Sequence, residues 1–335
     1  MAVLALGERR VRSSAQDKDK DKSMNSSARL AAIHSLDHFA LRVPDLNVAA
    51  SFYEAFGLSV ARVGEVLTLK CAGSGHVWAR VVQGASKGLA WLSFGCSDTD
   101  YRGLLRQLEA AGAQRQDGPR EAESGGSWYT DPDGNLLQIK VGPKVSPSGR
   151  PVAQPLASER LRAVEGGRKG APRVRPTRLS HLLLFSHDVP RQSAFYGEAL
   201  GLGLADTSLD LLSFLYGQQG SDHHLLAFAK SARRGFHHVA WTVSSIEDCG
   251  LGGRQMVDAG YRHGWGVGRH GVGSNHFYYA RDPWGSYCEY SADIDFIAAG
   301  AVWPCGQHEP LEALCFWGPD LPEAFLVNSE GAAPT

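Results

Sequence analysis

Two halves of the chain repeat the same pattern, and this duplication constrains the fold more than any other feature of the sequence. LDHFALRV at 36–43 is followed by SFYEAFGLSV, and LSHLLLF at 179–185 is followed by AFYGEALGLGL. In both copies an apolar, β-rich run leads into an amphipathic helix that ends at Gly. His38 and His181 each stand fourteen positions before a Phe, so the two halves match residue by residue.

Each half is itself divided into two similar segments, each of which predicts a strand, a helix and three further strands. Near the end of each half, YTDPDGNLLQIKV matches YARDPWGSYCEYSA, where an Asp-Pro turn precedes a strand. Four βαβββ modules follow, at about 36–86, 87–142, 178–230 and 235–292. Two such modules placed edge to edge form a half-barrel whose concave face gathers strand side chains. The predicted fold is therefore α+β, with two half-barrel domains.

The domain boundaries follow from composition. Residues 1–30 contain DKDKDKS and few residues that could be buried, which predicts a disordered extension. An N-terminal two-module domain is expected over 31–142, a Pro-, Arg- and Gly-rich linker over 143–177, and a C-terminal two-module catalytic domain over 178–292. The tail 293–335 is too apolar for a solvated end, so we expect it to pack on the catalytic domain or at a subunit interface.

The overall composition narrows the class of protein. With 34 basic and 35 acidic residues the net charge is −1, which gives no general attraction for nucleic acid. No apolar run approaches the length of a membrane span, so no membrane partner is expected. The six cysteines form no CxxC pair and favour reduced thiols, several of them buried. The first apolar run is too short for a signal peptide, and we expect a cytoplasmic protein.

The duplication also points to a metal site. We expect the side chains at three equivalent positions in each half to meet. One position is on the first strand of the half's first module, and the other two are on the first and last strands of its second module. The C-terminal half places His181, His238 and Glu289 there, and the N-terminal half places His38, Gly88 and Gln138. Two imidazoles and one carboxylate form the facial arrangement typical of Fe(II) oxygenases. A lone His in an apolar strand is usually a hydrogen-bonded core residue, and we assign that role to His38.

The motifs LSHLLLF, HHLLAFAK, GFHHVAW, GRHGVGSNHFYYARDP and SYCEY resemble those of the type I extradiol ring-cleavage dioxygenases of the vicinal oxygen chelate superfamily. The resemblance covers about 36–292. It implies Fe(II), with Mn(II) as the alternative metal, on His181, His238 and Glu289. It also implies a catalytic acid and base at His224, with His270 and Tyr279 binding a catechol-type substrate that reacts with O2. It further implies a homo-oligomer.

Two other functions stay open at the level of sequence. A glyoxalase-like isomerase or epimerase uses a similar paired-module metal site, although it generally needs a further carboxylate and does not need His224, His270 and Tyr279. A non-catalytic module that binds an aromatic ligand would not need a complete triad. The tandem pairs His223–His224 and His237–His238 leave a one-residue ambiguity. Because a strand alternates its faces, only one residue of each pair is expected to point inward.

Overall fold

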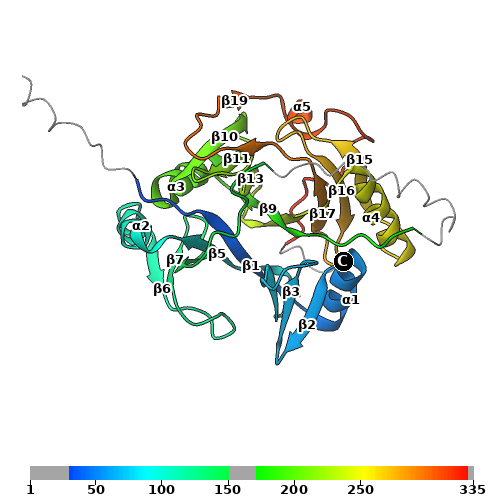
Figure 1. The fold of residues 1–335 in the computed structure, drawn as a ribbon, viewed down its shortest axis with the longest axis horizontal. Coiled ribbons are helices and arrows are strands. Elements are labelled where there is room, and N and C mark those ends of the chain that lie inside the picture. Colours follow the sequence, from blue (N-terminus) through cyan, green and yellow to red (C-terminus); the bar gives the residue numbers. More distant parts are fainter. Residues whose placement is uncertain (1–29, 151–170, 331–335) are drawn as a thin grey trace, which may run out of the picture. The chain divides into compact units, whose positions relative to one another are not determined.

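The computed structural model describes residues 30–150 and 171–330. Its contacts divide the chain into the units Met1–Leu30 and Ala31–Thr335, and the description below concerns the second. The predicted extension over 1–30, except for Leu30, and the middle of the predicted linker lie outside the described residues. Figure 1 shows the arrangement of the elements.

The N-terminal half builds one eight-stranded sheet in the order β2-β3-β4-β1-β5-β8-β7-β6. Its centre is the antiparallel pair β1 and β5, which are the first strands of its two modules. The elements are β1 (Ser35–Val43), α1 (Leu46–Phe56), β2 (Ser59–Val63), β3 (Val66–Lys70), β4 (Ala79–Gln83), β5 (Gly88–Cys96), α2 (Asp98–Ala110), β6 (Gln114–Gln116), β7 (Ser127–Thr130) and β8 (Leu136–Val141).

The C-terminal half repeats this plan in a sheet of order β15-β16-β17-β14-β9-β13-β11-β10, again centred on the first strands of its modules, β9 and β14, and the tail adds an outer strand, β19 (Gly306–Gln307), beside β10. The elements are β9 (Arg178–Ser186), α3 (Val189–Leu200), β10 (Leu202–Ser208), β11 (Leu212–Gly217), β12 (Ser221–Asp222), β13 (Leu226–Lys230), β14 (Gly235–Thr242), α4 (Ile246–Asp258), β15 (Gly264–Arg269), β16 (His276–Arg281) and β17 (Tyr287–Ala292). The predicted α+β fold of four modules is confirmed.

The equivalent helices α1 and α3 begin and end with the same chemistry. The carboxylate of Asp45 accepts two backbone N–H groups at the start of α1, and that of Asp188 accepts one at the start of α3. Both helices end at a Gly in the left-handed conformation, Gly57 with φ 101° and Gly201 with φ 67°. A Cβ at Gly57 would lie 2.2 Å from the Val174 carbonyl oxygen, so the end of the linker packs where only glycine fits.

The two halves share one apolar core. Helix α1 packs against α4 and α2 against α3, which brings the halves together at two places (Figure 1). Phe39 of β1 stacks on Phe236 of β14 with ring centroids 5.9 Å apart. Phe56 stacks on Tyr290 at 3.8 Å, and the Tyr290 hydroxyl donates to the Phe56 carbonyl oxygen at 2.8 Å. Neither half therefore completes its core alone.

The tail continues over the C-terminal half with three short elements, β18 (Phe296–Ile297), β19 (Gly306–Gln307) and α5 (Pro310–Leu314). β19 pairs with β10, and β18 pairs with β12. Further along, the Trp265 indole N–H donates to the Pro319 carbonyl oxygen at 2.9 Å. The described part of the tail thus lies against the half that carries the predicted site.

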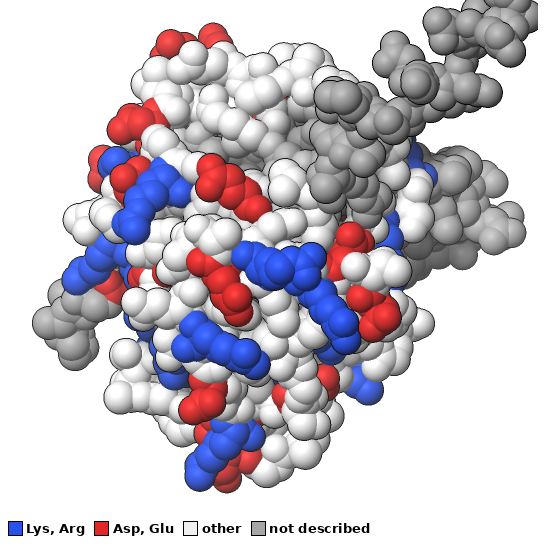
Figure 2. Space-filling model, turned by 90° about the vertical axis from the view of Figure 1, so that its left-hand side faces the viewer, with Lys and Arg blue, Asp and Glu red and all other residues white. Residues whose placement is uncertain are grey.

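The distribution of surface charge and the state of the cysteines agree with what the composition predicts. On the face shown in Figure 2, Lys and Arg side chains are interspersed with Asp and Glu, so charge of each sign is balanced locally. The six cysteines are all free, and four of them are buried, as predicted. Among the described residues, the structure contains no helix with the length and apolar character to cross a membrane.

Candidate metal centre

The three predicted ligands converge from three neighbouring strands. His181 on β9 lies opposite Ala240 on β14, and Ala240 lies opposite Glu289 on β17, so one cross-strand row carries two of the ligands. His238 stands two residues before Ala240 on β14 and therefore faces the same side. One donor atom from each of the three lies within 4.8 Å of the other two. Glu289 Oε2 is 3.3 Å from His181 Nε2 and 3.5 Å from His238 Nε2.

The donor atoms of this group suit a metal ion. Glu289 is fully buried, yet its Oε2 has no hydrogen-bond partner among the described residues, and neither does His238 Nε2. Unpaired buried polar atoms are costly unless a further group binds them. The remaining carboxylate oxygen, Oε1, accepts a hydrogen bond from the Asn275 side-chain amide at 2.9 Å. Asn275 thus holds the carboxylate and leaves Oε2 directed at the two imidazoles.

Hydrogen bonds on the Nδ1 side of the His181 ring place its ring proton on Nδ1, away from Nε2, the atom that would bind a metal. Arg178 pairs with Asp222 through two N–H groups at 2.6 and 2.9 Å, so Asp222 is held as an acceptor. Ser180 donates its hydroxyl to Asp222 at 3.0 Å. The Ser180 oxygen is then free to accept from His181 Nδ1, which lies 3.1 Å away. With the proton on Nδ1, His181 Nε2 presents a lone pair, as a metal ligand requires.

The three predicted catalytic residues surround this group. His224 lies in the irregular segment between β12 and β13 rather than on a strand, and its ring centroid is 4.1 Å from that of His181. Tyr279 lies on β16 with its ring 5.2 Å from His238, and its hydroxyl is 2.9 Å from His270 Nε2. His270 follows β15 directly, with Nε2 3.8 Å from Glu289 Oε1. The structure therefore brings all six predicted site residues together.

Burial controls the protonation of these groups. It lowers the pKa of His224 well below its usual value, and nearby His181 and His223 lower it further. Burial also lowers the pKa of His270, although the Glu289 carboxylate opposes that shift. For Tyr279, burial and then the Glu289 charge raise the pKa well above its usual value. At neutral pH His224 and His270 are therefore neutral bases, and Tyr279 is a phenol that can donate.

Both tandem His pairs are buried, and this corrects the expectation that one residue of each would face outward. A β-bulge in β14 between Phe236 and His238 breaks the alternation of faces, so His237 and His238 lie with their Nδ1 atoms 2.7 Å apart. His223 and His224 lie outside the regular ladder, with Nδ1 atoms 3.1 Å apart. Four residues that support the site had no role predicted from the sequence: His223, His237, Asn275 and Asp222. Only the two tandem His pairs gave any sign of them.

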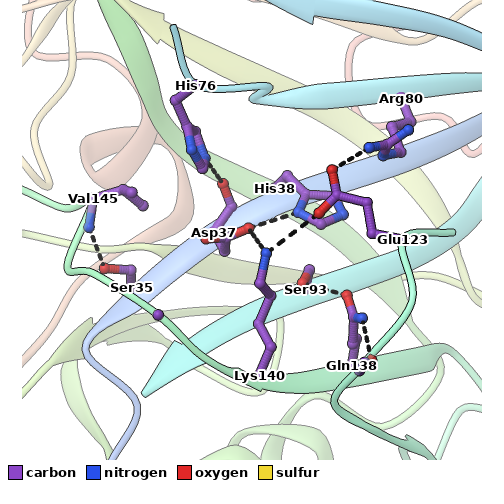
Figure 3. A network of polar contacts seen from close by, with 12 residues as sticks. Ser35, Asp37, His38, His76, Arg80, Ser93, Glu123, Gln138, Lys140 and Val145 are labelled. Carbon is purple, nitrogen blue, oxygen red and sulfur yellow. Dashed lines mark hydrogen bonds and ion pairs between the residues drawn. The ribbon is translucent and has the colours of Figure 1, made fainter. Parts of the chain in front are cut away.

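The equivalent place in the N-terminal half is filled by hydrogen bonds between side chains. There His38 Nδ1 pairs with Asp37 at 2.7 Å, and Ser93 donates to Gln138 Oε1 at 2.7 Å (Figure 3). The strand register puts Trp91 at the position of His238, and its indole N–H donates to His38 Nε2 at 3.3 Å.

The prediction of Gly88 at this position is thus wrong. Gly88 begins β5 as Gly235 begins β14, whereas the ligand lies three residues inside the strand. Trp91 and Gln138 replace an imidazole and a carboxylate, so this site lacks the ligands for a metal. The core role assigned to His38 matches its buried hydrogen bonds.

Paired βαβββ modules around such a site define a member of the Glyoxalase/Bleomycin resistance protein/Dioxygenase superfamily, whose family model matches residues 35–139 and 178–290. Metapyrocatechase 2 of Cupriavidus necator is 50% identical over 320 residues, covering 92% of this chain and 98% of the relative. The chain therefore belongs to the extradiol ring-cleavage dioxygenases of that superfamily, which are metal-dependent oxidoreductases.

Two solved structures show the same fold. The Mn(II)-bound glyoxalase of Novosphingobium aromaticivorans has a TM-score of 0.71 at 22% identity and covers 88% of this chain and 94% of its own. A halotolerant catechol dioxygenase, BphC, has a TM-score of 0.70 at 21% identity and covers 89% of this chain and 99% of its own. At this level of identity the likeness concerns the fold alone.

Proposed function

We propose that this enzyme opens a catechol-type ring beside its two hydroxyls with O2, using Fe(II), or Mn(II) as the alternative metal, held by His181, His238 and Glu289. The observation that carries the proposal is the meeting of three buried donor groups, two of whose donor atoms have no hydrogen-bond partner within the described ranges 30–150 and 171–330. Its 50% identity with Metapyrocatechase 2 supports a catechol as the substrate class.

When bound, the metal would bring the diol and O2 together and lower the pKa of a catechol hydroxyl. The protein's own part is the handling of protons. His224 is neutral, so it can accept a proton from the substrate and return it as the ring opens. The Tyr279 phenol can donate to a substrate oxygen, and His270 Nε2 can accept from a hydroxyl. The product is a ring-opened semialdehyde or a related acid.

This activity belongs to the breakdown of aromatic compounds. We place the enzyme in the cytoplasm, in keeping with its six free cysteines. The buried thiols are held unreactive, since burial raises the pKa of Cys96 to about 12.

The test is anaerobic reconstitution with Fe(II), followed by oxygen uptake and ultraviolet-visible spectra on monocyclic, trihydroxylated and biaryl catechols. Glu289→Gln, which copies Gln138 of the N-terminal half, is the matched variant. We expect yellow ring-opened product from the parent and a loss of more than about 100-fold in the variant, because even the hydrogen-bond partners of metal ligands contribute about 10- to 100-fold to activity. Metal binding without oxygen uptake on any catechol would instead favour an isomerase, and the absence of metal binding would refute the site.

A further inference from the structure

The metal ligand His238 is supported by a chain of hydrogen bonds that ends in the C-terminal tail. Nε2 of His238 can bind a metal only when the ring proton is on Nδ1, and that N–H then needs an acceptor. The atom in place is His237 Nδ1, at 2.7 Å. His237 Nδ1 accepts only when His237 carries its own proton on Nε2. That nitrogen lies 2.7 Å from the carbonyl oxygen of Phe325, which can only accept.

A backbone carbonyl of the tail also fixes the ring proton of His270, in this case by direct contact. Its Nδ1 lies 2.5 Å from the carbonyl oxygen of Leu314, a second tail residue that can only accept. The proton of His270 is therefore on Nδ1, and its Nε2 accepts from the Tyr279 hydroxyl at 2.9 Å. Two backbone carbonyls of the tail thus decide which nitrogen presents a lone pair on each of these site histidines.

The tail is held firmly enough for this role. The Phe325 side chain is buried, with ring centroids 4.8 Å from His237, 4.9 Å from Tyr279 and 4.7 Å from Trp265. Near α5, Val272 N–H donates to the Ala313 carbonyl oxygen at 3.1 Å, beside Leu314. Both carbonyls are therefore fixed by packing against the loops and strands that bear the site.

We propose that the tail segment Pro310–Phe325 is part of the metal site, and that it fixes the proton positions on His238, through His237, and on His270. His237 is then a positioning residue, because it acts on the metal through His238. The inference rests on the proposed function for its metal, whereas the arrangement of protons belongs to the metal-free protein as well.

The first experiment measures Fe(II) and Co(II) affinity of the metal-free full-length protein, by anaerobic competition with a chelator. His237→Leu removes the acceptor for His238 Nδ1–H, and we expect it to weaken binding about 10- to 100-fold. His237→Asn keeps an oxygen acceptor near the same place and should recover most of the affinity. Phe325→Ala loosens the carbonyl and should weaken binding, whereas Phe316→Ala, an exposed Phe of the same segment, should not. Far-ultraviolet circular dichroism checks that every variant is folded.

The second experiment reads the protons directly. In 15N-labelled metal-free protein, the ring nitrogens of His237 and His238 should report single, fixed tautomers, and Phe325→Ala should convert them to mixtures. Unchanged metal affinity in His237→Leu, or mixed tautomers in the parent, would overturn the inference. A parent that binds no metal would refute the proposed function instead, and the nitrogen spectra would still decide the inference.

Discussion

At the scale of single residues, the site depends on histidines that stay neutral because they are buried. Burial lowers the pKa of His237 to about 4, and it lowers those of His224 and His238 in the same direction. In the unfolded chain such groups have their ordinary pKa near 6.5. Between pH 6.5 and 4 the unfolded state therefore binds more protons, so the free energy of unfolding decreases as the pH falls through this window.

For the metal-free protein we expect a loss of about 1.4 kcal/mol per pH unit for each such histidine. Urea unfolding at pH 7.5, 6.5, 5.5 and 4.5 measures it. His237→Asn removes one titrating group, so its stability should depend on pH less steeply by about one proton. Ionisable groups that do not contact His237 contribute to both proteins and cancel in the comparison, whereas the neighbouring His238 also loses the charge of His237 that lowers its pKa. Equal slopes for parent and variant would mean that His237 is not held neutral by the fold.

At the scale of elements, the turn between β7 and β8 clamps helix α3. The buried Asp131 carboxylate accepts from Gln192 at 2.5 Å and from the Tyr196 hydroxyl at 3.0 Å, in addition to Asn135 of its own turn. Its repeat counterpart, Asp282, accepts backbone N–H groups of its own turn. Asp131→Ala leaves three further side-chain donors unpaired and should cost about 3 kcal/mol more than Asp282→Ala. Chemical denaturation of the two variants compares these costs, and equal costs would show that the clamp adds no stability.

The sequence predicts elements well where the signal is local. Strand periodicity, helix ends and the duplication were sufficient for the four modules and for the approach of His181 to Glu289. The short tail elements β18, β19 and α5 have no such signal, because they form only against the strands that they cover. The β-bulge in β14 and the register that places Trp91 of the N-terminal half at the position equivalent to His238 depend on pairing across the sheet. The Phe325 carbonyl oxygen is a backbone atom that every residue type has, so the sequence could not reveal its role.

At the scale of the whole molecule, the two halves should unfold as one unit although only one carries the site. Phe39 of the N-terminal half is fully buried between Phe236 and Trp241 of the C-terminal half, with ring centroids 5.9 and 6.2 Å away. Phe39→Ala should therefore lower the stability of the entire chain by about 3 to 5 kcal/mol. It should do so without removing any proposed ligand.

Ellipticity, tryptophan fluorescence and loss of bound metal should then all change at one denaturant concentration, in the parent and in Phe39→Ala alike. Fluorescence reports on both halves, because Trp91 and Trp241 are buried in different sheets. Val63→Ala, at a side chain that is 66% exposed, is the control and should shift the midpoint little. A separate early transition that leaves the metal bound would show that the N-terminal half folds independently. In that case the duplicated half would not support the site through the shared core, and its retention would need a different explanation.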